Sequence, residues 1–372
     1  MAIRMVEYAA EQIPAVKAFN SRMDQAGAGA FRLAETAPDH SRESCDGVSF
    51  LHFLAIDGNG EVRGGYFMRL QPLRLRGQVR TVGQFTAPLS EGIIDKRHAA
   101  VGPMLISHAL KLQPLLFSSG MGGLQQPLPR MMKGLGWHVM EVPFWFRVIR
   151  GSRFLRNIGP LRKDALRRLA ADTLAFSGIG SLGIAVAQQF RTRASFDRQF
   201  HTEPLTEFGP WADDVWNQSQ DEYLLSAVRN ADYLRFNYPQ TAHPYSGIKL
   251  LDAGAPVGWV NLLECRPQNK SYFGAMKVAA MIDGVARRPF IPSLVTSAVR
   301  TAKENGADMV FSNQTHQDWT EALRNAGFWP GPSNYLLALS KELARCLEPL
   351  TEAIPRIHFN RGDGDGRVNL IG

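Results

Sequence analysis

The sequence predicts a mixed α+β protein built from two similar lobes, each a mixed but largely antiparallel sheet flanked by helices. Three observations predict it: the composition of a folded chain, a hairpin pattern that occurs twice, and the same helix and strand order after each hairpin. The chain has 372 residues, 45% of them hydrophobic and 20% charged, so it is long enough for two domains.

The hairpin pattern is two apolar runs joined by a short turn. Residues 52–70 contain such runs around Asp57 to Gly60, and residues 248–265 contain them around Asp252 to Ala255. Apolar runs separated by a few turn-forming residues predict antiparallel strands. Each half therefore begins its sheet with a hairpin.

The segments that follow each hairpin also correspond. Residues 103–119 and 292–313 both show a helical apolar period followed by a short buried strand. Residues 130–140, around Gly136, and residues 322–332, around Gly327, both show a helix that ends at glycine before another strand. Because the blocks keep one order in both halves, we expect an internal repeat.

This repeat sets the expected domains. We predict an N-terminal domain over residues 1–150, a basic and apolar helical linker over 151–205, a C-terminal domain over 206–345 and a tail over 346–372. The tail holds Asp363 and Asp365 among glycines, and we expect a flexible tail or an edge strand there rather than a metal site. No metal is expected elsewhere, since the three cysteines have no metal-binding spacing.

The positive charge is concentrated in one segment. The chain carries a net charge of +8, and residues 150–198 hold ten Arg and Lys against three Asp, so the rest is nearly neutral. Nucleic-acid binders spread such charge over a groove, which makes a nucleic-acid partner unfavourable here. Basic residues beside the apolar run 170–187 indicate either an element on an anionic membrane surface, within residues 150–190, or a linker helix packed between domains.

The N-terminal sequence and the spacing of the cysteines indicate the expected cellular compartment. The N-terminus lacks the apolar core of a signal peptide, and no stretch is long and apolar enough to span a membrane as one helix. Widely spaced cysteines fit a reducing compartment. We expect a cytoplasmic protein, peripheral at the inner membrane face if the basic segment binds lipid.

The hairpin, the helix-opening loop and the Gly-Trp or Gly-Phe before a strand resemble the GNAT acyltransferases. The resemblance covers residues 48–150 and 247–340, as a tandem pair like double-GNAT and FemAB-type proteins. It implies an N-acyltransferase that uses acetyl-CoA or a longer acyl-CoA to acylate an amine of a small-molecule or lipid-linked envelope-precursor acceptor. A FemAB-like aminoacyl transferase using charged tRNA and a non-catalytic binding protein of this fold remain alternatives.

In that family a Gly-rich turn before a helix holds the pyrophosphate of CoA on backbone N–H groups. The matching positions here lie between Arg97 and Gly102, where Ala replaces the first glycine of the pattern. The resemblance assigns donor binding to this loop and to one residue of the second half: Arg97, His98, Ala100, Val101, Gly102 and Asn313. The second half lacks both glycines of the pattern, so we expect the donor in the first half. An ordinary helix start is the alternative for the loop, and a helix cap for Asn313.

Amine acylation needs a base for the ammonium proton and an acid for the thiolate. Glu91 and Asp95 precede the loop where relatives carry the base, and ordinary surface positions are the alternative for both. The tyrosine that usually acts as the acid is missing, so Tyr66, or a serine such as Ser118 of the Gly-rich loop 118–123, is the candidate replacement.

Overall fold

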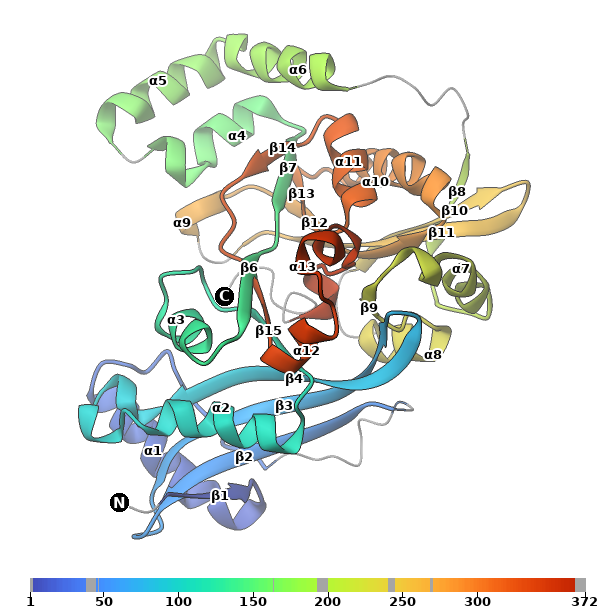
Figure 1. Ribbon diagram of the computed structural model, residues 1–372. Coiled ribbons are helices and arrows are strands. Elements are labelled where there is room, and N and C mark those ends of the chain that lie inside the picture. The colour runs from blue at the N-terminus through green and yellow to red at the C-terminus, as the bar shows by residue number, and fades with distance from the viewer. Residues whose placement is uncertain are drawn as a thin grey trace. The chain divides into compact units, whose positions relative to one another are not determined.

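The computed structural model describes residues 3–37, 45, 47–162, 164–192, 200–239, 245–267 and 270–364. The chain forms two compact units. Unit 1 comprises Met1–Leu73, Val79–Met140 and Leu336–Glu348, and unit 2 comprises Arg74–Gln78, Glu141–Tyr335 and Pro349–Gly372. The ribbon in Figure 1 shows that each unit holds a sheet with helices packed on it.

The sheet of unit 1 follows the order β1-β2-β3-β4-β5-β15-β6. Its strands are β1 (Ile3–Glu7), β2 (Ser49–Asp57), β3 (Val62–Leu75), β4 (Gln78–Ser90), β5 (Leu116–Gly120), β15 (Leu336–Leu339) and β6 (His138–Glu141). Its helices are α1 (Ile13–Gln25), α2 (Val101–Leu112) and α3 (Pro127–Gly134). The apolar period of α2 places Leu105, Ile106 and Ala109 in the core against the sheet.

The sheet of unit 2 follows the same plan, read as β8-β10-β11-β12-β13-β7-β14. Its strands are β8 (His201–Leu205), β10 (Tyr245–Asp252), β11 (Ala255–Cys265), β12 (Val278–Ala286), β13 (Met309–Asn313), β7 (Phe144–Val148) and β14 (Trp329–Gly331). The helices that follow its strands are α7 (Trp211–Ser219), α8 (Ala231–Asn237), α9 (Lys270–Phe273), α10 (Ile291–Glu304) and α11 (Gln317–Asn325), and a short strand β9 covers Leu225–Ala227.

The two sheets correspond strand by strand, which confirms the repeat. Both hairpins lie where the sequence predicts them, and in each sheet the third strand of the meander pairs in parallel with the strand after the next helix. Gly60 donates its N–H to Asp57 O at 3.0 Å and has φ of 81°, a value that glycine adopts without strain. The fold class is the predicted one.

One feature of the strand order lies outside that prediction. The sixth strand of each sheet comes from the other half of the chain, because β7 pairs with β13 and β15 pairs with β5. Residues 141–150 therefore belong to unit 2, whereas the predicted first domain ran to residue 150. The segment Leu336–Glu348 belongs to unit 1 for the same reason.

The predicted linker and tail both contain helices. Within residues 151–192 the chain forms α4 (Gly151–Asn157), α5 (Ala165–Phe176) and α6 (Ile179–Arg191). Helix α12 (Lys341–Arg345) precedes the predicted tail and belongs to unit 1. The tail contains α13 (Leu350–Ala353) and the 3-10 turns Ile354–Arg356 and Arg361–Asp363. Of the two expectations for this stretch, the flexible tail is wrong for residues 357–363, because Ile357, His358 and Asp363 are buried. Asp365 lies outside the described residues.

Candidate functional site

The strands β4 and β5 of unit 1 pair over a short distance. Their parallel register joins Gly83 to Leu116 and Gln84 to Phe117 and includes no later residue of β4, although β4 continues to Ser90. Ala87, within that unpaired part, has φ of 46°, which a non-glycine residue adopts at a bulge or other irregularity. We call the place where the two strands part, after Gln84 and Phe117, the first opening.

The helix α2 begins beside this part of β4. A 3-10 turn, Lys96–His98, leads into α2 at Val101, and the first N–H groups of a helix lack intrahelical partners. The Arg97 side chain is 87% exposed and Ala100 is exposed at the helix start. An exposed helix start with an arginine next to it suits an anion such as a pyrophosphate.

The remaining predicted loop residues point elsewhere. His98 and Val101 are buried. A Cβ added at Gly102 would lie 3.4 Å from the Met131 methyl carbon of α3, so a bulky residue at Gly102 would displace Met131. The structure thus makes Gly102 a contact between two helices, and a binding test at this position would mix packing with phosphate contact.

The Gly-rich loop lies at the carboxyl end of β5. Gly120, Met121, Gly122 and Gly123 all have positive φ, between 66° and 112°. Such a run exposes backbone that side chains would otherwise cover, and it leaves room for a ligand to approach the end of the strand. Ser118 is buried within β5, and the neighbouring Ser119 Oγ is buried with no hydrogen-bond partner among the described residues.

The predicted bases both form ion pairs. Glu91 is 4% exposed and accepts hydrogen bonds from Arg22 Nε at 2.7 Å and Arg63 Nη1 at 2.9 Å. Burial alone would raise the pKa of Glu91, but the two arginines lower it below its ordinary value. Asp95 caps the 3-10 turn through Arg97 N, and its hydrogen bonds from Arg97 lower its pKa to about 2. Neither geometry favours a role as general base.

Tyr66 differs from these carboxylates. Its hydroxyl lies 2.8 Å from His108 Nδ1 of α2, and burial raises the pKa of Tyr66 well above its ordinary value. Burial also lowers the pKa of His108, so the imidazole is neutral at pH 7. The pair keeps Tyr66 protonated, as a proton donor requires, but the Tyr66 side chain is 3% exposed.

In unit 2 the corresponding opening, where β12 and β13 part, is filled by the C-terminal segment Ile357–Asp363. β12 and β13 pair from Val278 with Met309 to Met281 with Ser312, and β12 then continues to Ala286. Asn360 forms a bridge with Gln314 just after β13, and Asn360 Nδ2 donates to Asp283 Oδ1 of β12 at 2.8 Å. Arg361 Nε donates to Asn313 Oδ1 at 2.8 Å. Asn313, predicted to bind the acyl donor, thus contacts the C-terminal segment Ile357–Asp363. The alternative prediction, that Asn313 caps the next helix, is wrong, because no side chain caps α11.

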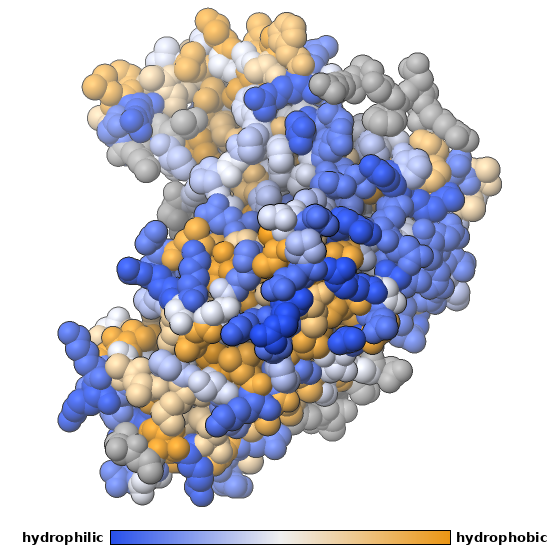
Figure 2. All heavy atoms as spheres, in the orientation of Figure 1, coloured by the Kyte–Doolittle hydropathy of each residue, from blue (hydrophilic) through white to orange (hydrophobic). Residues whose placement is uncertain are grey.

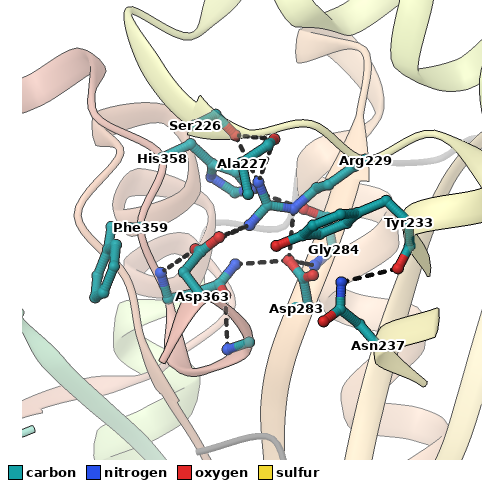
Figure 3. A network of polar contacts seen from close by, with 12 residues as sticks. Ser226, Ala227, Arg229, Tyr233, Asn237, Asp283, Gly284, His358, Phe359 and Asp363 are labelled. Atoms are coloured by element: carbon teal, nitrogen blue, oxygen red, sulfur yellow. Dashed lines mark hydrogen bonds and ion pairs between the residues drawn. The ribbon is translucent and has the colours of Figure 1, made fainter. Parts of the chain in front are cut away.

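A buried ion network holds this segment in place (Figure 3). The Arg229 side chain is fully buried and donates to Asp283 Oδ1 at 2.9 Å and to Asp363 Oδ1 and Oδ2 at 2.8 and 2.9 Å. Asp283 also accepts from the Tyr238 hydroxyl at 2.8 Å. Burial raises the pKa of Asp363 to about 6 in spite of Arg229. A Cβ added at Gly362 would lie 2.9 Å from Asp283 Cβ, so the segment is packed without spare room.

A carboxylate caps the 3-10 turn before α10 in unit 2. The 3-10 turn Arg288–Phe290 leads directly into α10, and Arg288 N donates to Glu222 Oε1 at 3.1 Å. In unit 1 the Asp95 carboxylate accepts from Arg97 N at 2.9 Å in the same way, so a carboxylate caps the 3-10 turn before the helix in both units. Burial raises the pKa of Glu222.

Three buried residues of unit 2 are not predicted from the sequence: Arg229, Asp283 and His358. Asp283 is the one charged residue in the apolar strand Val278–Ala286, and a lone charge in such a strand signals a buried partner. His358 Nε2 donates to Gly284 O at 2.9 Å, and burial lowers the pKa of His358 well below its ordinary value. Among the described residues, no three His, Cys, Asp or Glu side chains gather in a way that could hold a metal ion.

No protein-family model and no curated protein matches the sequence. Solved structures do match the fold. A conserved protein of unknown function and probable N-acyltransferase from Enterococcus faecalis V583 matches with a TM-score of 0.52 and 8% identity, over 94% of this chain and 74% of that one. A GCN5-related N-acetyltransferase from Anabaena variabilis ATCC 29413 matches with 0.53 and 12%, over 93% and 75%.

A third match is the Saccharomyces cerevisiae N-myristoyltransferase with bound myristoyl-CoA, with a TM-score of 0.50 and 10% identity, over 91% of this chain and 78% of that one. At these identities the likeness concerns the fold. The fold is that of GNAT-type N-acyltransferases, with two such sheets in one chain.

Proposed function

We propose that the protein is an acyl-CoA-dependent N-acyltransferase whose donor binds unit 1. The acceptor is an amine of a small molecule or of a lipid-linked envelope precursor. The observation that carries the proposal is the contrast between the two openings. The first opening adjoins the exposed start of α2, whereas the corresponding opening in unit 2 is taken by Asn360–Asp363.

The chemistry of CoA fits the residues at the first opening. A pyrophosphate needs N–H donors and positive charge, and the start of α2 offers N–H groups. Arg97 is 87% exposed and would exchange its ion pair with Asp95 for one with the phosphate. An extended thioester arm can hydrogen-bond to a strand whose neighbour has parted from it, as β4 offers after Gln84. In this proposal Tyr66 or Ser118 protonates the leaving thiolate. The solved N-myristoyltransferase of the same fold has myristoyl-CoA bound, which supports an acyl-CoA donor here.

Calorimetric titration of the full chain with CoA, acetyl-CoA and a long-chain acyl-CoA tests the proposal. Ala100→Glu puts a carboxylate at the exposed start of α2, and we expect it to weaken binding about ten-fold or more by repelling the pyrophosphate. Ala100→Gln, of equal size without the charge, should bind more tightly than Ala100→Glu. Pro289→Glu, at the exposed matching position before α10, is the matched control and should leave binding unchanged.

The outcomes separate the alternatives. Loss of binding in Pro289→Glu but not in Ala100→Glu would place the donor in unit 2 and contradict the proposal. If none of the three CoA compounds bound, the result would favour a FemAB-like aminoacyl transferase or a non-catalytic binding protein. Aminoacyl-tRNA binding would then point to a FemAB-like transferase, and its absence to a non-catalytic binding protein.

A further inference from the structure

The helices α5 and α6 present a wide apolar face to solvent. Phe176 and Phe190 are each 87% exposed and Leu166 is 81% exposed. Further large apolar side chains on the same two helices are more than 40% exposed: Leu169, Leu174, Ile179, Leu182 and Val186. Figure 2 shows apolar residues gathered over α5 and α6. We call these eight residues the apolar face; contiguous exposed patches of this kind mark interaction surfaces.

The opposite side of the two helices is already packed. Ala171 and Ala175 of α5 are buried, and a Cβ at Gly180 of α6 would lie 2.5 Å from Leu155 of α4. Gln188 of α6 accepts from Val148 N at 2.8 Å and donates to Val148 O at 2.9 Å, which ties the helix to the edge of β7. The helices are therefore held by unit 2, and the apolar face is not the side by which they pack on it.

Positive charge adjoins the apolar face. Arg156 of α4 and Arg167, Arg168 and Arg191 are exposed. Arg167 also pairs with Asp164 at 3.2 Å while staying 64% exposed, and the less exposed Arg162 pairs with Asp172 at 2.5 Å. In the described residues 150–162 and 164–192, which include α4, α5 and α6, the only acidic residues are Asp164 and Asp172, so arginines outnumber acidic residues there. Arginines around exposed Leu, Ile and Phe are typical of helices that lie on anionic membranes.

The geometry of the pair fits a surface position. Among the described residues no single helix combines the length and apolar character needed to cross a membrane, and α5 with α6 reach that composition only together, with an angle of 81° between them. A second copy of the chain would bring like charges together at this face, which opposes self-association. An anionic bilayer surface satisfies both the apolar side chains and the arginines.

We propose that α5 and α6 form a membrane-surface anchor, with the apolar face inserted at the acyl boundary of an anionic bilayer and Arg156, Arg167 and Arg168 at its headgroups. This inference does not rest on the proposed acyltransferase activity. It extends that activity, because a surface anchor would hold the enzyme where lipid-linked amines are found.

Flotation of the full chain with vesicles tests the anchor. Vesicles of phosphatidylglycerol and phosphatidylcholine should bind the protein, phosphatidylcholine vesicles should bind it about ten-fold less, and physiological salt should weaken the binding. A variant with Phe176→Gln, Ile179→Gln, Leu182→Gln and Phe190→Gln should bind the anionic vesicles at least about ten-fold less than the wild type. These side chains are exposed, so circular dichroism and the melting temperature should stay unchanged.

The matched control substitutes exposed apolar residues of unit 1, Val79→Gln, Ile93→Gln and Leu112→Gln, and should bind like the wild type. A charge variant with Arg156→Gln, Arg167→Gln and Arg168→Gln should lose the salt-sensitive part of the binding. Equal binding by wild type and apolar variant would overturn the proposal. The proposal would also be overturned if the wild type did not bind vesicles but formed a concentration-dependent dimer, seen by light scattering, and the apolar variant did not form that dimer.

Discussion

Replacing Arg229 by methionine tests whether the ion network holds the C-terminal segment in unit 2. The side chain is fully buried and donates three hydrogen bonds to Asp283 and Asp363 together, besides those to Ser226 Oγ at 2.5 Å and Ala227 O at 3.1 Å. Methionine fills a similar length without charge. It leaves two buried carboxylates without their cation, and removing one partner of a buried ion pair costs about 3 to 5 kcal/mol.

The loss of unfolding free energy in Arg229→Met should be larger at high pH than at low pH. Burial raises the pKa of Asp363 to about 6, so the wild-type contribution of this group to stability falls as pH rises from its unfolded value of 3.8 through about 6. Without Arg229 the same carboxyl should hold its proton more strongly still. We therefore expect Arg229→Met to lose about 4 kcal/mol at pH 8 and clearly less at pH 5, where Asp363 is neutral.

Urea denaturation followed by tryptophan fluorescence measures this, since six of the seven tryptophans lie in unit 2. The matched control is Arg288→Met, because Arg288 is 67% exposed and pairs with Asp318 at 3.1 Å. An exposed pair of this kind is worth at most about 1 kcal/mol. Equal losses in the two variants, or a larger loss at pH 5 than at pH 8, would refute the reasoning.

The remaining predictions concern Glu91 and α6. Glu91→Gln should destabilise unit 1 by about 2 to 4 kcal/mol by breaking a buried pair with Arg22 and Arg63, as measured by thermal or urea denaturation. Because the pKa of Glu91 is lowered, this difference should be present above its ordinary pKa and shrink as pH falls below it. A variant of full stability that has lost the low-pH limb of its pH–rate profile would instead identify Glu91 as the base. Gly183→Ala in α6, where a Cβ meets nothing within 4 Å, should stabilise the protein by about 0.5 to 1 kcal/mol; a lower melting temperature would contradict the helix assignment.

Local patterns were enough to predict the lobes. The turns at Asp57 and Asp252 and the helices that end before Gly136 and Gly327 are short-range signals, and the structure has each where the sequence predicts it. The strand exchange has no such signal. Phe144–Val148 and Leu336–Leu339 are both short apolar runs, and nothing in either run specifies which sheet it joins.

The site shows the same division between local and long-range information. The exposed start of α2 at Arg97 and Ala100 follows from the local loop and helix pattern. The pairing of Glu91 with Arg22 joins residues 69 positions apart, and that of Arg229 with Asp363 joins residues 134 positions apart. Asp363 lies in a glycine-rich stretch that is typical of loops, and it is ordered because a buried arginine needs its charge.

We propose that unit 1 holds the acyl donor and that unit 2 does not. A crystal structure of the full chain with CoA tests it most directly. We predict the pyrophosphate at the start of α2 beside Arg97 and Ala100, with the thioester arm along β4 after Gln84 and with Asn360 still bonded to Asp283. CoA at the start of α10, with Glu222 and the segment 357–363 displaced, would contradict it.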